Sequence, residues 1–269
     1  MSRIGDTFAR LAGEDRAAFM PFLTCGDPSA EATLELMSAF AEAGVGLIEL
    51  GMPFSDPLAD GPVIQAASTR ALTGGMTVAG ALGVLRRFRE RSAVPVCLMG
   101  SYNPALRYGA ERFCADAAAA GADGLIIPDL PPEESEGFVA LSDSSGLDNV
   151  FLVAPTTTPE RLALIGGLSR GFIYYISITG VTGARERLAG DIREHVDLIR
   201  RRSDLPVAVG FGTKTPEQAA EVAREADGVI VGSAIVSRIA ERAGAPDLVE
   251  STASFVRSFV EAVASARKA

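Results

Sequence analysis

The feature that most constrains the fold of this chain is a regular alternation of short apolar runs with longer amphipathic stretches. The apolar runs are rich in Val, Ile and Leu, and they are continuous rather than interrupted by polar residues at every second position. Such runs are typical of parallel strands that are buried on both faces. The pattern predicts eight strands, at Phe19–Thr24, Leu47–Gly51, Val94–Met99, Gly124–Pro128, Val150–Ala154, Phe172–Ser177, Pro206–Gly210 and Gly228–Gly232.

The amphipathic segments between these runs predict the helices. Thr158-Pro159-Glu160 and Thr215-Pro216-Glu217 are typical helix starts, because threonine accepts the free N–H bonds while proline occupies the first helical position. A helix stop followed by a strand also recurs, as in Ala43-Gly44-Val45 and Ala226-Asp227-Gly228, so the βα unit itself is repeated. The predicted helices span Ile4–Gly13, Ala30–Ala43, Pro62–Thr73, Val78–Arg91, Ala110–Ala120, Pro132–Leu141, Pro159–Leu168, Ile192–Arg202, Pro216–Glu225 and Asp247–Ala264.

Eight βα units of about 30 residues each account for the chain length without a second domain. No Pro-, Gly- or Ser-rich linker divides the 269 residues. The sequence therefore predicts an α/β protein, a single (β/α)8 TIM barrel domain over 1–269, in preference to an open doubly wound sheet. To this repeat it adds an N-terminal helix, Ile4–Gly13, and an insertion after the second strand, Met52–Gly61.

Charge and composition exclude several classes of partner. The chain has 25 Lys plus Arg against 34 Asp plus Glu, a formal net charge of −9 without a basic run, which argues against nucleic acid. An anionic substrate remains possible, since backbone amides and helix N-termini bind anions. The N-terminal segment carries charges, and no stretch approaches the roughly 20 apolar residues of a membrane span. We therefore expect a cytoplasmic protein without a membrane partner.

Cysteine and histidine provide no metal site. Cys25, Cys97 and Cys114 are widely spaced and form no CxxC pair, and His195 is the only histidine. We interpret the three thiols as buried and reduced, and His195 as a surface residue of a charged helix rather than a catalytic one.

The active site of a (β/α)8 barrel lies at the carboxyl ends of its strands, and Glu49 is placed to reach that position. Strand alternation puts Glu49 on the face opposite Ile48 and Leu50, which points it into the mouth of the barrel. Desolvation there should raise the pKa of its carboxyl, as a general acid or base requires. The alternative is a buried structural glutamate paired with an arginine, but no neighbouring strand offers an inward-pointing Arg or Lys.

The loop that follows holds three prolines and two glycines between Gly51 and Pro62, which indicates a shaped loop. Asp60 precedes Gly61-Pro62 and is either a helix cap or turn residue, or a second carboxylate beside Glu49. Two carboxylates with different pKa values would suit acid/base chemistry.

Three glycine-rich segments follow strands in the last third of the chain, at Thr179–Gly183, Gly210–Lys214 and Gly232–Ile235. Barrels commonly build a phosphate site from backbone N–H groups after the seventh and eighth strands, so this pattern predicts phosphate binding rather than ordinary tight turns. Tyr174 and Tyr175 lie in the sixth predicted strand, where alternation sends one ring inward and the other outward. Either is a core residue, or the inward one directs its phenol into the site; Phe22 would form an apolar wall. In the absence of a nucleophile–base pair, a dinucleotide motif or a strand lysine, cofactor-free acid/base chemistry on a phosphorylated, partly apolar substrate is the best interpretation.

These motifs resemble the alpha chain of tryptophan synthase, and the resemblance extends over essentially the whole chain. The most specific segment is the Glu49–Pro62 stretch, Glu-Leu-Gly-Met-Pro-Phe-Ser-Asp-Pro followed by Ala-Asp-Gly-Pro. The other matching segments are Phe19–Pro28, Asp123–Pro131, Gly180–Gly183, Gly210–Gly212 and Gly232–Ser233.

The resemblance implies a lyase that cleaves indole-3-glycerol phosphate to indole and D-glyceraldehyde 3-phosphate by a retro-aldol step. Glu49 would protonate the indole ring and later accept the hydroxyl proton, while Asp60 would bind the indole N–H. The substrate pocket implied by the family comprises Phe22, Tyr174, Thr182, Gly183, Phe211, Gly212, Gly232 and Ser233.

The resemblance also implies a partner. Asp56 and Asn103 would face a beta chain in an alpha2-beta2 tetramer, and that chain would hold pyridoxal phosphate and receive the indole through an internal channel. This chain would carry no cofactor. The alternatives are another phosphate-binding barrel enzyme, such as an indole-3-glycerol phosphate synthase, and a non-catalytic regulatory barrel. The former needs a catalytic lysine in an early strand, whereas the only lysines are Lys214 and Lys268.

Overall fold

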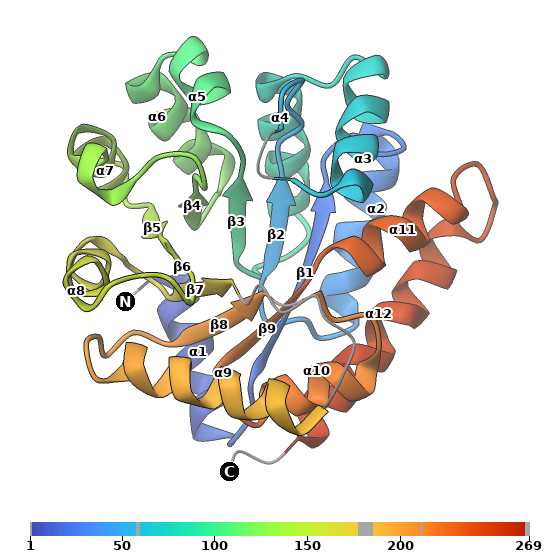
Figure 1. Cartoon of the computed structure of the whole chain (residues 1–269). Coiled ribbons are helices and arrows are strands. Elements are labelled where there is room, and N and C mark those ends of the chain that lie inside the picture. The colour runs from blue at the N-terminus through green and yellow to red at the C-terminus, as the bar shows by residue number, and fades with distance from the viewer. Residues whose placement is uncertain (1, 58–59, 177–184, 211, 267–269) are drawn as a thin grey trace.

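The computed structural model of this chain describes residues 2–57, 60–176, 185–210 and 212–266. Within these residues, parallel strands form one sheet around the centre and helices surround it (Figure 1). The strands are β1 (Ala18–Thr24), β2 (Ile48–Gly51), β3 (Val96–Met99), β4 (Gly124–Ile126), β5 (Asp148–Val150), β6 (Leu152–Val153), β7 (Ile173–Ile176), β8 (Val207–Gly210) and β9 (Gly228–Val231). The order of the strands in the sheet is β5-β4-β3-β2-β1-β9-β8-β7-β6.

The two ends of this sheet belong to one stretch of chain, and this closes the barrel. β5 pairs with β4, whereas β6 pairs with β7. Only Phe151 separates β5 from β6, and its carbonyl accepts a hydrogen bond from the Tyr174 N–H at 3.1 Å. The predicted strand Val150–Ala154 therefore exists, but it begins at Asp148 and divides at the point where its partner changes. The eight-stranded barrel prediction is confirmed.

Helices follow the strands as the βα repeat requires. Ser29, Thr77, Thr158 and Thr215 each cap a helix by accepting a backbone N–H, and the two Thr-Pro-Glu starts are among these four. The helices are α1 (Arg3–Gly13), α2 (Ala30–Glu42), α3 (Pro62–Thr73), α4 (Val78–Arg89), α5 (Tyr102–Tyr108), α6 (Ala110–Ala120), α7 (Glu136–Ser144), α8 (Pro159–Leu168), α9 (Arg185–Arg200), α10 (Pro216–Ala223), α11 (Ser233–Glu241) and α12 (Leu248–Ser265).

Two helical predictions need correction, and two helices were not predicted. The predicted helix Pro132–Leu141 is a 3-10 turn, η1 (Pro132–Glu134), followed by α7, and α9 begins seven residues before the predicted start at Ile192. The short helices α5 and α11 were not predicted at all. α5 has seven residues, too few to show an apolar period, and α11 begins within a segment that was interpreted as a glycine-rich strand end.

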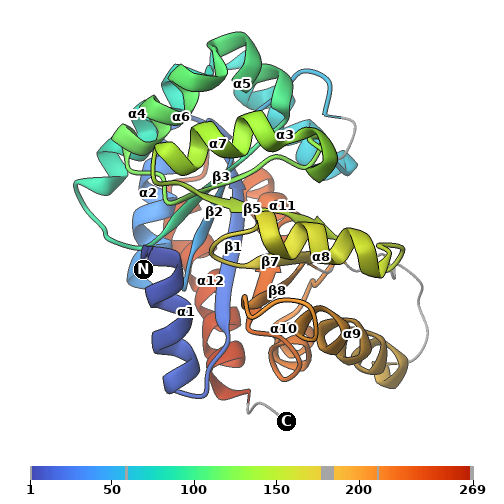
Figure 2. The ribbon, with the colours of Figure 1, turned by 90° about the vertical axis from the view of Figure 1, so that its left-hand side faces the viewer.

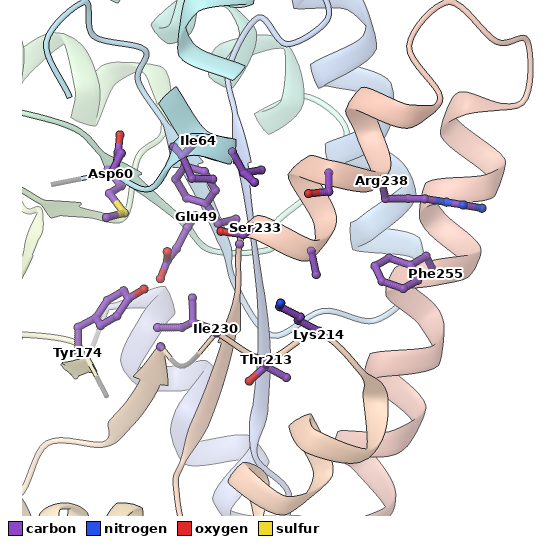
Figure 3. A pocket seen from close by; sticks show the side chains of 18 of the residues that line it. Glu49, Asp60, Ile64, Tyr174, Thr213, Lys214, Ile230, Ser233, Arg238 and Phe255 are labelled. Atoms are coloured by element: carbon purple, nitrogen blue, oxygen red, sulfur yellow. The ribbon is translucent and has the colours of Figure 1, made fainter. Parts of the chain in front are cut away.

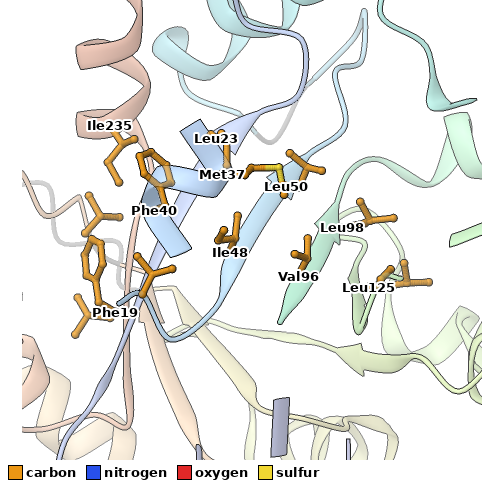
Figure 4. Close-up of a cluster of buried hydrophobic side chains, with 14 of the residues drawn as sticks. Phe19, Leu23, Met37, Phe40, Ile48, Leu50, Val96, Leu98, Leu125 and Ile235 are labelled. Atoms are coloured by element: carbon orange, nitrogen blue, oxygen red, sulfur yellow. The ribbon is translucent and has the colours of Figure 1, made fainter. Parts of the chain in front are cut away.

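The main apolar layer lies between the strands and the surrounding helices. Outward-facing strand residues such as Ile48, Leu50 and Val96 are fully buried there against helix residues such as Met37 and Phe40 (Figure 4). These residues alternate along each strand with residues that point inward. Burial on both faces explains why the strands are continuous apolar runs.

Helix α1 fills the end of the barrel where the strands begin (Figure 2). Ile4, Phe8 and Leu11 of α1 pack with inward-facing strand residues, and each of the three is at most 5% exposed. Glycine makes room for this helix: a Cβ at Gly124 would lie 3.1 Å from Ile4 Cδ1 and 2.9 Å from the carbonyl oxygen of Asp148. The predicted N-terminal helix therefore closes the end of the barrel at which the strands begin.

None of the helices in the described part of the chain combines the length and apolar character that a bilayer span needs.

We predict that Gly124→Ala destabilises the barrel by about 1–3 kcal/mol, because the new methyl group meets rigid backbone as well as α1. Urea unfolding at neutral pH measures this loss. The matched control is Gly83→Ala, since a Cβ there meets no atom within 4 Å and lies inside α4. That control should stabilise the chain by up to about 1 kcal/mol. Equal midpoints for the two variants would contradict this packing of α1 against Gly124.

Candidate functional site

A cavity of about 720 Å³ opens at the carboxyl ends of the strands (Figure 3). It extends from the interior of the barrel to the helices α11 and α12. Both carboxylates singled out in the sequence, Glu49 and Asp60, line it. The other predicted site residues in its lining are Phe22, Tyr174, Gly212, Gly232 and Ser233.

Glu49 lies at the floor of this cavity. The strand register places it between Phe22 of β1 and Cys97 of β3, and its side chain is fully buried. Within the described residues, neither carboxyl oxygen has a hydrogen-bond partner. Desolvation raises its pKa from an ordinary 4.5 to about 8, so the group is mostly protonated at neutral pH. The arginine partner of the structural alternative is absent from the described part of the chain.

Two aromatic rings flank Glu49 at positions that glycines leave open. A Cβ at Gly51 would lie 2.5 Å from Phe22 Cζ, and one at Gly210 would lie 2.5 Å from Tyr174 Cε1. The Tyr174 hydroxyl and the Glu49 carboxyl point toward one another in Figure 3. Burial, and next the nearby Glu49, raise the pKa of Tyr174 well above its ordinary value, so the phenol stays protonated. The inward direction predicted for one of the two strand tyrosines therefore belongs to Tyr174.

Asp60 lies at the rim, on the loop between β2 and α3. It does not cap α3, because Gly61 is the N-cap residue and supplies no side-chain bond. Its backbone is held on both sides: the Asp60 N–H donates to the Pro57 carbonyl at 3.0 Å, and Gln65 Nε2 donates to the Asp60 carbonyl at 2.8 Å. Partial burial raises the pKa of its carboxyl. The loop therefore presents a second carboxyl to the cavity that holds Glu49.

The part of the cavity wall formed by the start of α11 and the segment after β8 presents backbone groups. α11 begins at Ser233, and its N-cap residue Gly232 provides no side-chain hydrogen bond, so the first N–H groups of the helix are free of a capping side chain. Gly212 lines the same wall from the end of β8. Free N–H groups and the positive end of a helix dipole suit a phosphate. Three further predicted residues, Thr182, Gly183 and Phe211, lie outside the described residues.

A second cavity of about 270 Å³ adjoins the first. Asp56 and Asn103, the two predicted partner-facing residues, line it and are both exposed. The two cavities share four lining residues: Phe22, Asp60, Ile64 and Met99. The cavity lined by Asp56 and Asn103 therefore shares part of its wall with the cavity that holds Glu49 and Asp60.

Comparison with known proteins assigns the family. The sequence profile of the tryptophan synthase alpha chain matches residues 8–265. The tryptophan synthase alpha chain of Geobacter sulfurreducens is 50% identical over 263 residues, which cover 98% of this chain and 99% of that protein. That of Chloroflexus aurantiacus is 50% identical over 265 residues, with the same coverage.

This chain belongs to the tryptophan synthase alpha chain family.

Solved structures of the tryptophan synthase family agree with this assignment. A crystal structure of the alpha subunit from Legionella pneumophila has a TM-score of 0.91 at 39% identity and covers 98% of both chains. Tryptophan synthase from M. tuberculosis gives 0.88 at 38% identity, covering 98% of this chain and 99% of that one.

Several lining residues of this family member were not predicted from the sequence. Ile64, Met99, Lys214 and Arg238 all line the main cavity. Met99 ends a predicted strand and Lys214 ends a predicted glycine-rich segment. Their positions in the sequence could therefore have indicated that both line the site. Ile64 and Arg238 lie on helices, α3 and α11, and only the folded arrangement brings them to the site.

The cysteines and the histidine lie elsewhere. Cys25, Cys97 and Cys114 are buried and unpaired, and burial raises the pKa of Cys25 to about 12 and that of Cys114 to about 11. His195 stacks on Tyr175 at 5.3 Å and does not line the cavity. Among the described residues, no group of three His, Cys, Asp or Glu side chains is arranged for a metal ion.

We predict that Glu49 lowers the stability of the fold as the pH rises. Between pH 4.5 and 8 the unfolded state has released the Glu49 proton while the folded state still holds it, so deprotonation favours unfolding. Relative to Glu49→Gln, the wild type should lose about 1.4 kcal/mol of unfolding free energy per pH unit over this range, and no more above it. Urea unfolding of both proteins at pH 5, 6, 7 and 8 measures the difference. A difference that stays constant with pH would overturn the assignment of a protonated, buried Glu49.

Proposed function

We propose that this chain catalyses the reaction of its family, the cleavage of indole-3-glycerol phosphate to indole and D-glyceraldehyde 3-phosphate, with Glu49 as its general acid and base. The observation that carries the proposal is the buried, unpartnered carboxyl of Glu49 at the floor of the main cavity. A carboxyl with a pKa of about 8 holds a proton at neutral pH and is a strong enough base, once ionised, to take one back.

The proton balance of the reaction requires one group that serves twice. In the first step Glu49 donates its proton to the indole ring carbon that bears the glycerol chain, which produces an indolenine-like cation. In the second step the Glu49 carboxylate takes the proton of the adjacent glycerol hydroxyl. The carbon–carbon bond then breaks, its electrons return to the ring, and the hydroxyl carbon becomes the aldehyde. Glu49 ends protonated, as it began, and no co-reactant is consumed.

Asp60 is proposed to stabilise the intermediate. The indole nitrogen becomes positive when the ring carbon is protonated, and a carboxylate that accepts its N–H offsets this charge. Asp60 is less buried than Glu49 and lies at the rim of the same cavity. Two carboxyls in different environments can therefore hold different protonation states, one an acid and the other an anion.

The rest of the cavity suits the two ends of the substrate. Phe22, Ile64 and Met99 offer an apolar surface for the indole ring, and Tyr174 directs its phenol at Glu49. We assign the phosphate to the wall formed by Gly212, Gly232 and Ser233. The family motif assigns Thr182, Gly183 and Phe211 to the same substrate.

The partner follows from the family: the alpha chain acts with a beta chain in the tryptophan synthase tetramer. We assign Asp56 and Asn103 to that interface. The second cavity, which these residues line, shares a wall with the first and is our candidate for the beginning of the indole path. Pyridoxal phosphate belongs to the beta chain in this proposal, and Glu49 and Asp60 supply the chemistry of this chain without a cofactor. The single domain over 1–269 and the cytoplasmic location stay predictions.

Family membership decides against the two alternatives considered from the sequence, another phosphate-binding barrel enzyme and a non-catalytic regulatory barrel. The position of Lys214 agrees with this decision. It follows β8, whereas the ring-closing synthase needs its lysine in an early strand.

We predict that Glu49→Gln lowers kcat for indole release from indole-3-glycerol phosphate by about 100-fold or more, because glutamine can neither donate nor accept the proton. Substrate binding, measured by equilibrium dialysis, should be retained. Glu241→Gln is the matched control: Glu241 lines the outer part of the same cavity, so its variant should keep kcat within about 2-fold. Wild-type turnover in Glu49→Gln would overturn the mechanism, and an inactive wild type, even with its beta chain, would overturn the function.

We predict that Asp56→Ala weakens association with the cognate beta chain by about 5-fold, since an exposed interfacial charge contributes about 1 kcal/mol. Titration calorimetry of the two purified chains measures the affinity. Asp6→Ala is the control, because Asp6 is an exposed acid on α1 at the opposite end of the barrel. Equal affinities of the two variants for the beta chain would show that the assignment of Asp56 to the interface is wrong.

A further inference from the structure

Lys214 lines the main cavity without an assigned role. The chain uses arginine almost throughout, and Lys214 and Lys268 are its only two lysines. Lys214 lies two residues after Gly212, and its ammonium group points into the cavity in Figure 3. The proton-transfer chemistry derived above gives this residue no role.

The backbone holds Lys214 in place at the start of α10. Its N–H donates to Gln218 Oε1 at 2.8 Å, and the Thr215 hydroxyl caps the same helix by accepting the Gln218 N–H. The neighbouring Thr213 is only 3% exposed, and its hydroxyl has no hydrogen-bond partner among the described residues. The segment therefore brings a cation and an unsatisfied hydroxyl to the wall assigned to the phosphate.

Among the described residues that line this cavity, Lys214 is the basic residue without an ion pair. Arg238, the other basic residue in the lining, donates to Ser251 Oγ at 2.6 Å and lies 3.9 Å from Glu241. Lys214 forms no ion pair with the described residues. The acids of the lining, Glu49, Asp60 and Glu241, would repel a phosphate dianion, and backbone N–H groups supply only partial charge to oppose this.

We propose that Lys214 binds the phosphate of the substrate and makes the site selective for phosphate esters. The proposal rests on the proposed function, since it assumes that indole-3-glycerol phosphate occupies this cavity. A lysine acts on phosphate as a flexible point charge rather than a fixed fork, so it can follow the group without setting its orientation. Gly212 and Ser233 would set the orientation, and Lys214 would supply the full charge.

The test compares Lys214→Met, Lys214→Arg and wild type in the cleavage of indole-3-glycerol phosphate. Lys214→Met should raise KM by about 10-fold and leave kcat within about 2-fold, because the phosphate is remote from the bond that breaks. Lys214→Arg should restore most of the affinity. The inhibition constant of inorganic phosphate should rise in Lys214→Met in parallel with KM, and added salt should raise the wild-type KM more than that of the variant.

Arg201→Met is the matched control, since it removes the same charge from an exposed residue that does not line the cavity. It should leave both constants unchanged. An unchanged KM and phosphate inhibition constant in Lys214→Met would overturn the proposal while the proposed function stands. A fall in kcat at unchanged KM would also overturn it, because the loss would then be one of catalysis or structure. Failure of the proposed function is recognised separately, as an inactive wild type.

Discussion

The closed register of the parallel strands is the constraint on which the rest of the structure depends. Once Asp148–Val153 pairs with β4 through its first half and β7 through its second, each strand has a fixed inward face. The register then places Phe22, Glu49 and Cys97 side by side. A slip of one residue would turn Glu49 into the apolar layer beneath the helices and expose Ile48 to the cavity. The chemistry of the site is therefore a consequence of strand alternation.

The buried carboxyl of Glu49 lowers the stability of the fold, and the proposed proton transfer gives this cost a reason. A carboxyl without a partner costs free energy when it ionises in an apolar environment, and a paired arginine would remove that cost. The same arginine would hold the pKa low and leave the group unable to donate a proton at neutral pH. The surroundings instead consist of aromatic rings seated over Gly51 and Gly210, which exclude water without providing a counter-charge. The fold gives up stability at this residue, and the proton transfer that we propose for Glu49 would account for that cost.

Much of this arrangement could be predicted from the sequence, and the failures have physical causes. The eight predicted strands are short, continuous apolar runs that stand out from the amphipathic segments between them, and the Thr-Pro-Glu segments predict two helix starts. Glu49 stood out because it interrupts such a run. The helix α5 was missed because seven residues contain too little periodicity, and α11 was missed because its start was interpreted as a glycine-rich strand end. Residues such as Ile64 and Arg238 reach the site only through the packing of their helices, which no local pattern encodes. The helix-cap role considered for Asp60 could be excluded only once Gly61 was seen at the cap.

The cavity separates the charges that the reaction needs. Glu49 must remain neutral until the ring approaches, yet the substrate brings a dianion into the same cavity, and a nearby negative charge raises the pKa of a carboxyl further. Too high a pKa would leave Glu49 a poor acid. The arrangement of the walls limits this effect, because Gly212 and Ser233, to which we assign the phosphate, line the part of the cavity that extends toward α11. A cation at Lys214 in that part of the cavity would cancel much of the field of the dianion before it reaches Glu49. In the proposed reaction, phosphate recognition and proton transfer are parts of one electrostatic problem, and our assignment places them at the ends of different strands.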